Sequence, residues 1–461
     1  MRRIVVVLVA VSLSGSVRAD ELSPAQQRVH AIYKELIEID TTHSSGSTTV
    51  AANAMAKRLT GAGFAAHDVH LLGRKPNRGN LVVRLHGSGS QPPLLLLAHL
   101  DVVEAKRSDW SVDPFKLIEH DGYFYGRGTL DDKVMAAIFV DQMIALKQER
   151  VRPNRDIILA LTADEEGGPD NGVAWLLAHH RSLVDAAVVL NEGGGGRMRD
   201  GRYLLNTVQA SEKTYTNFVL EVKNKGGHSS LPTKDNAIYR LADGLARLER
   251  FEFPVELSEV TRTFFARSAA IESDSVADDM RALLREPPDP AAVARLSDTP
   301  VHNAMIRTTC VATRLDGGHA DNALPQTARA NINCRILPGH TAAEVRDTLV
   351  RVLADEQIAI TEPEPAVPGP ASPIDPQFMS VVERLSESMW PGVPVVPTMS
   401  TGASDSRYFR NVGMAAYGVS GLFVEMDDIR AHGRDERIGV KQFYESWVFL
   451  SRLIRALATN G

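Results

Sequence analysis

The chain has 461 residues, a formal net charge of −6 and ordinary fractions of hydrophobic (44%) and charged (23%) residues. The negative balance, without a stripe of lysine and arginine, argues against a nucleic-acid-binding protein. A chain of this length exceeds what one hydrophobic core usually covers, so two domains are expected.

Residues 1–19 have the pattern of a secretory signal peptide. Arg2 and Arg3 supply positive charge, residues 4–13 are apolar, and the segment ending at Ala19 resembles a small-residue cleavage site. The apolar run is shorter than the ~20 residues that cross a bilayer. The sequence therefore predicts an exported protein, periplasmic or secreted, that has no membrane association after cleavage. An uncleaved anchor is the alternative interpretation.

The first domain is expected to alternate helices and strands. Helical spacing of apolar residues covers 23–40, where Ser23 is the expected cap and Pro24 lies in the first turn. Further helices are expected at 49–60, 133–147 and 172–180, and aliphatic runs typical of buried strands lie at 80–85, 93–98, 156–162 and 186–190. This alternation is typical of an α/β domain with a mostly parallel sheet covered by helices.

From residue 214 the pattern changes to that of a smaller α+β domain. Strands are expected at 215–222, 309–315, 327–337 and 358–361, and helices at 235–248 and 342–355. The order strand, helix, strand, strand, helix, strand is that of a ferredoxin-like unit. Residues 254–300 interrupt this unit as a charged insertion of helical tendency.

A proline-rich linker, EPEPAVPGPASPIDP, then leads back to the first domain. The expected division is therefore 20–213 for the first part of the larger domain, 214–364 for the inserted domain, and 365–461 for the linker and the rest of the larger domain.

The chain contains two cysteines, Cys310 and Cys334. A hairpin register centred on Asn322 would place them opposite one another on adjacent strands, within reach of a disulfide bond. In an oxidising compartment they would pair, whereas two buried thiols are the alternative. The sequence does not decide between the two.

Acidic and histidine residues follow, or lie beside, several of the expected strands. They are His99 and Asp101 in HLD, Asp131 in GRGTLDDK, Glu165 and Glu166 in ADEEGG, Glu192 in NEGGGG and His432 in AHGRDER. Strand ends are where an open α/β sheet collects its ligands. Carboxylate oxygens with two imidazoles suit a pair of zinc-like ions held together by a bridging carboxylate.

Each of these segments also has a simpler structural interpretation. His99 could be a hydrogen-bonded histidine at a strand end, and Asp132, next to Asp131, could cap the helix that follows. Glu165 and Glu166 could be a solvated surface pair, and the glycines at 193–196 a loose turn. Adjacent buried carboxylates repel unless a cation or proton separates their roles, and the combination of segments favours the metal site.

These segments, together with KGGHSSLP, NALP, CRILPG and GASDSR, resemble the dinuclear zinc peptidases and deacylases. That family includes aminoacylase, carnosinase, glutamate carboxypeptidase and succinyl-diaminopimelate desuccinylase. The motifs occur in the family's order over nearly all of the chain after residue 19. The ending HGRDERI is most similar to the vacuolar carboxypeptidases and the secreted N-acyl-amino-acid hydrolases.

The resemblance implies a zinc-peptidase catalytic domain with an inserted lid or dimerisation domain, and two Zn²⁺ ions, for which Mn²⁺ or Co²⁺ could substitute. The implied metal ligands are His99, Asp131, Glu166, Glu192 and His432. Asp131 would bridge both ions, with a cis peptide bond after it.

The remaining roles also come from the resemblance. Glu165 would act as general base, Asp101 would support His99, and His228 would stabilise the oxyanion from a partner subunit or by closing over its own site. Asn322 and Arg335 match positions that hold a substrate carboxylate, with Arg407 as a further contact and Gly402 in the same wall.

The expected activity is that of a metallopeptidase of carboxypeptidase or dipeptidase type, which cleaves an amide bond next to a free carboxylate. Deacylation of N-acyl amino acids is the alternative, because both substrate classes present a carboxylate to Arg335. A non-catalytic metal- or peptide-binding protein of the same fold is a third interpretation. The expected partners are a small peptide or N-acyl amino acid, without nucleic acid, and a second copy bound through the inserted domain.

Overall fold

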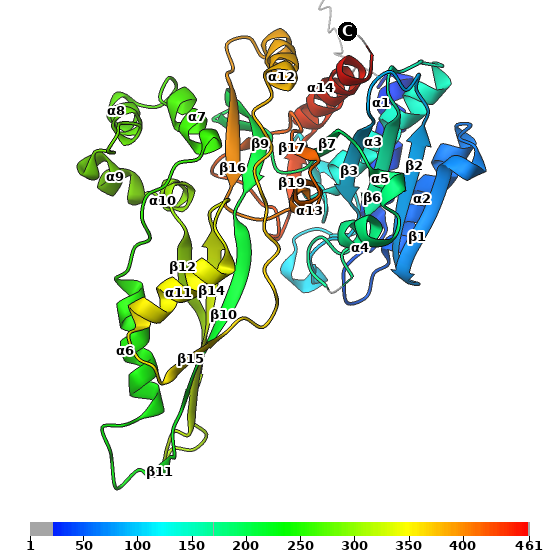
Figure 1. Cartoon of the computed structure of the whole chain (residues 1–461). Helices are drawn as coiled ribbons and strands as arrows, with labels where there is room; N and C mark the ends of the chain where they lie inside the picture. Colours follow the sequence, from blue (N-terminus) through cyan, green and yellow to red (C-terminus); the bar gives the residue numbers. More distant parts are fainter. Residues whose placement is uncertain (1–21, 169, 460–461) are drawn as a thin grey trace, which may run out of the picture.

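The computed structural model describes residues 22–168 and 170–459, so the predicted signal peptide at 1–19 lies outside the described residues. A larger domain surrounds a ten-stranded sheet, and an elongated smaller domain projects from it (Figure 1). Within the described ranges, no helix is both long enough and apolar enough to cross a membrane.

Four parallel strands form the centre of the large sheet. They lie in the order β6 (Ile157–Thr162), β3 (Leu94–His99), β7 (Val188–Asn191) and β17 (Ala415–Gly418). Strands β3 and β6 are buried along their whole length, as expected for strands covered on both faces.

The outer strands make the sheet mixed, with antiparallel pairs on both sides of the parallel centre. On one side lie β2 (Arg78–Leu85) and β1 (Val69–Lys75). On the other side lie β9 (Arg202–Glu212), β8 (Gly196–Arg199), β18 (Phe423–Glu425) and β16 (Val395–Ser400). A separate small sheet joins β19 (Arg437–Gly439), β5 (Tyr123–Tyr125) and β4 (Ile118–His120).

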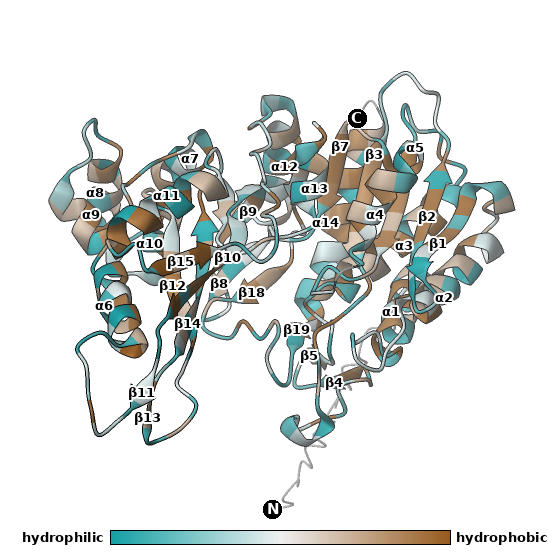
Figure 2. Ribbon diagram, turned by 60° about the horizontal axis from the view of Figure 1, so that its bottom comes forward, coloured by the Kyte–Doolittle hydropathy of each residue, from teal (hydrophilic) through white to brown (hydrophobic). Residues whose placement is uncertain are grey.

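Alternate residues of the central strands enter two different cores. Leu94 and Leu96 pack with α1 (Pro24–Glu38), α2 (Thr48–Gly61), α3 (Lys133–Gln148) and α14 (Val440–Ala458). Leu95 and Leu97 pack with α4 (Gly172–His179), α5 (Arg181–Val184) and α13 (Ser406–Asn411) on the opposite face. Figure 2 shows these strands as hydrophobic ribbons between the helices. The predicted α/β domain is confirmed, and α1 begins with the predicted Ser23 cap.

The smaller domain has the predicted ferredoxin-like order. Its antiparallel sheet runs β12 (Thr309–Gly317), β14 (Thr327–Ile336), β10 (Thr214–Lys223) and β15 (Ile358–Thr361). Helices α6 (Ala237–Glu249) and α11 (Ala342–Leu353) share its core. A short pair, β11 (Gly227–His228) and β13 (Ala323–Leu324), forms the far tip of this domain (Figure 1).

The insertion whose role the sequence left open is helical. It forms α7 (Glu259–Ser268), α8 (Asp274–Leu283) and α9 (Pro290–Ser297), followed by α10 (Pro300–Ile306). Helix α7 packs against β16, and Phe265 belongs to the same buried cluster as Met399 of that strand. After the smaller domain, the chain returns to the larger domain with α12 (Pro376–Met389), which directly precedes β16.

A disulfide bond joins Cys310 to Cys334. The two residues are direct partners in the β12–β14 register, as the register centred on Asn322 predicted. Because β12 is the edge strand of the small sheet, the bond ties this edge to its neighbour.

Reduction of this bond is expected to destabilise the protein. The bond closes a sequence separation of 24 residues, for which the loss of chain entropy in the unfolded state predicts a stabilisation of about 3 kcal/mol. The check is thermal unfolding with and without reductant. The Cys310→Ser/Cys334→Ser double variant should unfold at the lower temperature in both conditions. Identical unfolding of the oxidised and reduced wild-type protein would contradict the expectation.

Candidate metal centre and active site

The ends of three neighbouring parallel strands bring the predicted ligands together. His99 is the last residue of β3, Glu192 directly follows β7, and two residues separate the end of β6 from the Glu165–Glu166 pair. Because these strands run in the same direction, their carboxyl ends meet at one edge of the sheet. The loop that carries His432 reaches this edge from a distant part of the chain.

The Asp131 carboxylate lies between the two histidines. Its Oδ1 is 3.0 Å from His99 Nε2, and its Oδ2 is 3.1 Å from His432 Nε2. The peptide bond between Asp131 and Asp132 is cis, as the family resemblance implied. Each carboxylate oxygen therefore faces a different imidazole, which is the arrangement a bridging ligand requires.

Two sets of potential ligands share Asp131. One set is His99, Asp131 and Glu192, and the other is Asp131, Glu166 and His432; within each set the ligand atoms lie within 4.8 Å of one another. His432 Nε2 is 3.0 Å from Glu166 Oε2, and His99 Nε2 is 4.0 Å from Glu192 Oε1. Bond lengths of zinc to nitrogen and oxygen place tetrahedral ligand atoms about 3.3 Å apart, so these separations suit coordination.

The electrostatics of the edge favour added positive charge. Burial, followed by repulsion from Asp131, raises the pKa of Glu192 well above its usual range. Hydrogen bonds to Asp131 and Glu166 raise the pKa of His432 to about 10. Cations that bind here would replace the imidazole protons, because a histidine ligand must be neutral.

Unsatisfied buried oxygens support the same interpretation. Glu166 Oε1 and Asp101 Oδ1 are buried and have no hydrogen-bond partner among the described residues. Such atoms are costly unless something pairs with them. A donor set of carboxylates and imidazoles with unpaired oxygens therefore fits a pair of divalent cations.

Asp101 supports the site differently from the expected side-chain contact. The ring nitrogen His99 Nδ1 lies 2.9 Å from the backbone carbonyl oxygen of Asp101, whereas the nearest carboxylate oxygen is 3.6 Å away. The Asp101 carboxylate instead accepts a hydrogen bond from the backbone N–H of Glu166 at 2.9 Å. Asp101 thus orients one potential ligand by its main chain and another by its side chain.

Glu165 has a free carboxylate at the site. It makes no side-chain hydrogen bond or ion pair with any residue of the described ranges, and it lines the largest cavity at this edge. Burial, followed by repulsion from Asp405, raises its pKa well above the usual range. A carboxylate with a raised pKa next to a metal site suits proton transfer.

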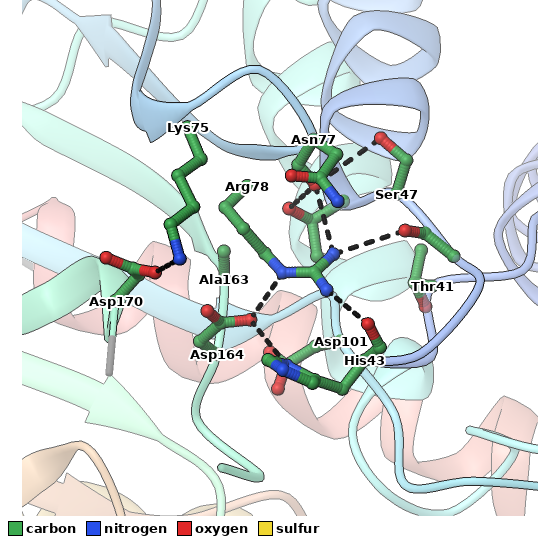
Figure 3. Close-up of polar contacts among 12 residues, drawn as sticks. Thr41, His43, Ser47, Lys75, Asn77, Arg78, Asp101, Ala163, Asp164 and Asp170 are labelled. Carbon is green, nitrogen blue, oxygen red and sulfur yellow. Dashed lines mark hydrogen bonds and ion pairs between the residues drawn. The ribbon is translucent and has the colours of Figure 1, made fainter. Parts of the chain in front are cut away.

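A buried arginine holds the loop that carries the two glutamates. Arg78 Nε lies 3.0 Å from Asp164 Oδ1, and Arg78 also donates to the backbone carbonyls of His43 and Gly46 (Figure 3). Asp164 directly precedes Glu165 and adopts a left-handed backbone with φ 58°, which aspartate tolerates better than most residues. The sequence analysis assigned no role to Arg78 or Asp164, since their pairing joins β2 to the loop after β6.

Glu436 holds Asp131 and the His432 loop together. Its Oε1 accepts hydrogen bonds from the backbone N–H groups of Leu130 (2.7 Å) and Asp131 (3.1 Å). Its Oε2 pairs with Arg127 at 2.5 Å, and Arg127 donates to the carbonyl of Gly433. Both residues lie in the quoted motifs GRGTLDDK and HGRDERI, but the motifs alone did not reveal their pairing.

The cavity beside the glutamates contains two of the predicted substrate residues. It has a volume of about 630 Å³, and its lining includes the acidic Glu165 and Glu166, His432, and the basic Arg335 and Arg407. Arg335 lies over the Tyr215 ring at 4.6 Å, and Arg407 over the Tyr408 ring at 4.7 Å. Gly402 lines the same cavity, as predicted. We call this cavity the substrate cleft.

His228 and Asn322 do not lie at the substrate cleft. Both are exposed at the β11–β13 tip, where the Ser229 N–H donates to the Asn322 carbonyl and His228 Nδ1 lies 2.7 Å from Ser230 Oγ. Neither residue lines the substrate cleft of its own chain in this structure. Their predicted roles need closure of the smaller domain or a second subunit.

The structure also tests the expected helix cap at Asp132 and the expected loose turn at glycines 193–196. Asp132 stands at the cap position of α3, but its side chain forms no capping hydrogen bond. The glycines after Glu192 allow close backbone approach, because a Cβ on Gly194 would lie 2.0 Å from the Gly418 carbonyl oxygen. The glycine run is therefore a packing requirement rather than a loose turn.

Removal of the Glu436 anchor is expected to weaken metal binding. The Glu436→Ala variant leaves the Asp131 N–H and Arg127 without their shared partner, and loss of such supporting groups typically lowers metal affinity by about 10- to 100-fold. Metal content after competition with a chelator measures the effect. Glu425→Ala, on the exterior strand β18, is the matched control. An unchanged affinity in Glu436→Ala would contradict the anchoring role.

Comparison with known proteins agrees with this geometry. A model of "Peptidase family M20/M25/M40" matches residues 95–456. The human N-fatty-acyl-amino acid synthase/hydrolase PM20D1 is 31% identical over 385 residues, which cover 81% of this chain and 76% of that protein. A probable carboxypeptidase S-like protein of Dictyostelium discoideum is 28% identical, covering 79% and 72% respectively.

A solved structure has the same fold. The M20 family metallo-carboxypeptidase Sso-CP2 from Sulfolobus solfataricus superposes with a TM-score of 0.70 at 18% identity, covering 93% of this chain and 98% of that one. The family resemblance seen in the motifs is confirmed, and the chain belongs to peptidase family M20/M25/M40.

Proposed function

We propose that this protein is a dinuclear metal-dependent hydrolase that cleaves an amide bond next to a free carboxylate, as a carboxypeptidase or dipeptidase does. The observation that carries the proposal is the Glu165 carboxylate, which has no hydrogen-bond partner among the described residues and lines the same cleft as Glu166 and His432 of one ligand set and as Arg335 and Arg407.

The ligand sets would hold two ions, with Zn²⁺ proposed and Mn²⁺ or Co²⁺ as alternatives. When bound, the pair would supply positive charge that acidifies water and polarises a carbonyl. The chain's own contribution is to hold the ligands at fixed separations and to keep Glu165 free. Glu165 takes the proton from the attacking water and returns it to the leaving amine.

The arginines of the substrate cleft would hold the substrate carboxylate. Burial lowers the pKa of Arg335, and this side chain has no acidic partner within the described ranges. A planar guanidinium forms paired hydrogen bonds with a carboxylate. Binding at Arg335, with Arg407 beside it, would place the neighbouring amide bond next to Glu165.

Hydrolysis of N-acyl amino acids is the second candidate, because the substrate carboxylate is the same. It is supported by the 31% identity to a relative named N-fatty-acyl-amino acid synthase/hydrolase. The two activities differ only in the group on the acyl side of the bond.

Two features of the proposal concern the surroundings of the enzyme. We infer export, which is supported by the signal-like pattern of residues 1–19 and by a disulfide bond, since disulfides persist in oxidising compartments. We also infer a homodimer through the smaller domain, which would let the exposed His228 reach a partner's cleft and donate to the oxyanion.

The Glu165→Gln variant tests the proposed base. Glutamine keeps the shape of the side chain but cannot accept the proton, so turnover should fall at least about 100-fold, while the metal content stays the same. The assay is a mass-spectrometric screen of the metal-loaded protein against mixed dipeptides and N-acyl amino acids. Glu119→Gln, an exposed carboxyl on β4, is the control. Full activity of Glu165→Gln would exclude this residue as the base.

Mixing two inactive variants tests the origin of His228. If His228 acts across a symmetric dimer, exchange of subunits between Glu165→Gln and His228→Ala should restore about a quarter of the wild-type activity, because one site in each mixed dimer is intact. Light scattering verifies the dimer, and mass spectrometry of the intact complexes verifies the exchange. Absence of recovery after verified exchange would mean that His228 does not act in trans.

A further inference from the structure

A second, smaller cavity adjoins two of the proposed metal ligands and shares no lining residue with the substrate cleft. It has a volume of about 200 Å³, and the carboxylates of Asp131, Asp132 and Glu192 form the acidic part of its wall. The rest of the wall is mainly apolar, with Leu130, Val134, Met135, Leu422, Val424 and Ile429. The substrate cleft is instead lined by Glu166 and His432 of the other ligand set. The two cavities therefore flank the centre on opposite ligand sets.

One cationic side chain, Arg197 of β8, lines this apolar cavity. It is only partly exposed, and it has no hydrogen bond, ion pair or aromatic contact with any residue in the described part of the chain. Burial lowers the pKa of its guanidinium, which indicates a poorly solvated charge. No carboxylate of the described structure neutralises it.

Other arginines in the interior have acidic partners. Arg127 pairs with Glu436, Arg78 with Asp164 at 3.0 Å, and Arg410 with Glu212 at 3.5 Å. A charge that is largely withdrawn from water is costly when it is unpaired. An arginine beside the catalytic centre with no acidic partner among the described residues therefore suits a ligand that carries a negative charge. Arg335 in the substrate cleft has the same property, and there the proposed ligand is the substrate carboxylate.

We propose that the Arg197 cavity binds the acyl side of the substrate and selects acyl groups that carry their own carboxylate on a short apolar chain. This inference rests on the proposed function and names its substrate class. With the amide bond at the metal ligands and one carboxylate at Arg335, the acyl group extends toward Asp131 and Glu192. Its methylene groups contact the apolar wall, and its distal carboxylate meets Arg197. The preferred substrate thus has an anion at each end.

The test compares two substrates that differ at the distal group. N-glutaryl-phenylalanine and N-hexanoyl-phenylalanine present acyl chains of similar length, with and without a carboxylate. The wild-type enzyme should have at least about a tenfold higher kcat/KM for the glutaryl substrate, as expected for a charge-assisted hydrogen bond in a poorly solvated site. Arg197→Met should abolish this preference by lowering kcat/KM for the glutaryl substrate without lowering it for the hexanoyl substrate, whereas Arg197→Lys should retain part of the preference.

Arg199→Met is the matched control, because Arg199 lies two residues along the same strand but is exposed and lies 4.0 Å from Asp427. It should keep the wild-type preference. The dipeptides Glu-Phe and Gln-Phe show whether an acidic amino-terminal residue is also preferred. A higher kcat/KM for Glu-Phe would extend the preference to acidic amino-terminal residues, and equal values would restrict it to dicarboxylic acyl groups. A wild-type preference for the hexanoyl substrate, or an equal loss of both activities in a folded Arg197→Met protein, would overturn the inference.

A binding measurement separates this inference from the proposed function. Calorimetry with the metal-loaded Glu165→Gln protein should show tighter binding of N-glutaryl-phenylalanine than of N-hexanoyl-phenylalanine. Adding Arg197→Met should weaken only the former, by about tenfold. If the wild-type protein cleaved neither amide but this binding difference persisted, the hydrolase proposal would fail and the Arg197 site would stand. Hydrolysis without any binding difference would refute the Arg197 site alone.

Discussion

The active-site region depends on several carboxylates that lie close together around Asp131 and are largely shielded from water. The two oxygens of Asp131 face His99 and His432 at 3.0 and 3.1 Å, with Glu166 and Glu192 beside them. Repulsion among these groups would scatter them in a flexible loop. A pair of cations turns the same repulsion into coordination, provided that the backbone holds the ligands in place.

The backbone meets this requirement through contacts that cross the fold. Three ligand-bearing segments begin at the ends of parallel strands, of which β3 and β6 are buried along their whole length. Glu436 ties the backbone of Asp131 to the His432 loop, and Arg78 holds the loop before Glu165. Buried ion pairs of this kind are poor evidence of stability, because desolvation offsets much of their attraction. Here they serve to fix positions, which a catalytic centre needs more than added stability.

The buried arginines with acidic partners differ from the arginines that line the two cavities. Arg127 and Arg410 have buried acidic partners, so their charge is satisfied within the protein. Arg335 and Arg197 line two different cavities, each of which also contains proposed metal ligands, and both lack acidic partners in the described structure. The proposed substrate would place one carboxylate at each of these arginines.

Much of the architecture was predictable because it depends on local patterns. Apolar periodicity indicated the buried strands, the helices and the ferredoxin-like order. The spacing of the two cysteines indicated their partnership in the β12–β14 register. The potential ligands could be proposed from the family resemblance of their motifs, and His99, Glu166 and Glu192 also follow predicted strands. The mixed edges of the large sheet, formed by β1, β8 and β9, were not apparent, because pairing direction depends on strands that are distant in sequence.

By itself, then, the sequence determined the family, the α/β and ferredoxin-like domains, and the residue types gathered for chemistry. Only the tertiary structure decided that Asp131 faces two imidazoles, that Glu436 and Arg78 hold the site, and that His228 lies at an exposed tip away from its own cleft. The physical reason is that periodicity and motifs act over a few neighbouring residues. The partner of a buried charge is set by packing between segments hundreds of residues apart. The same holds for Arg197, which has no acidic partner in the part of the chain that the structure describes.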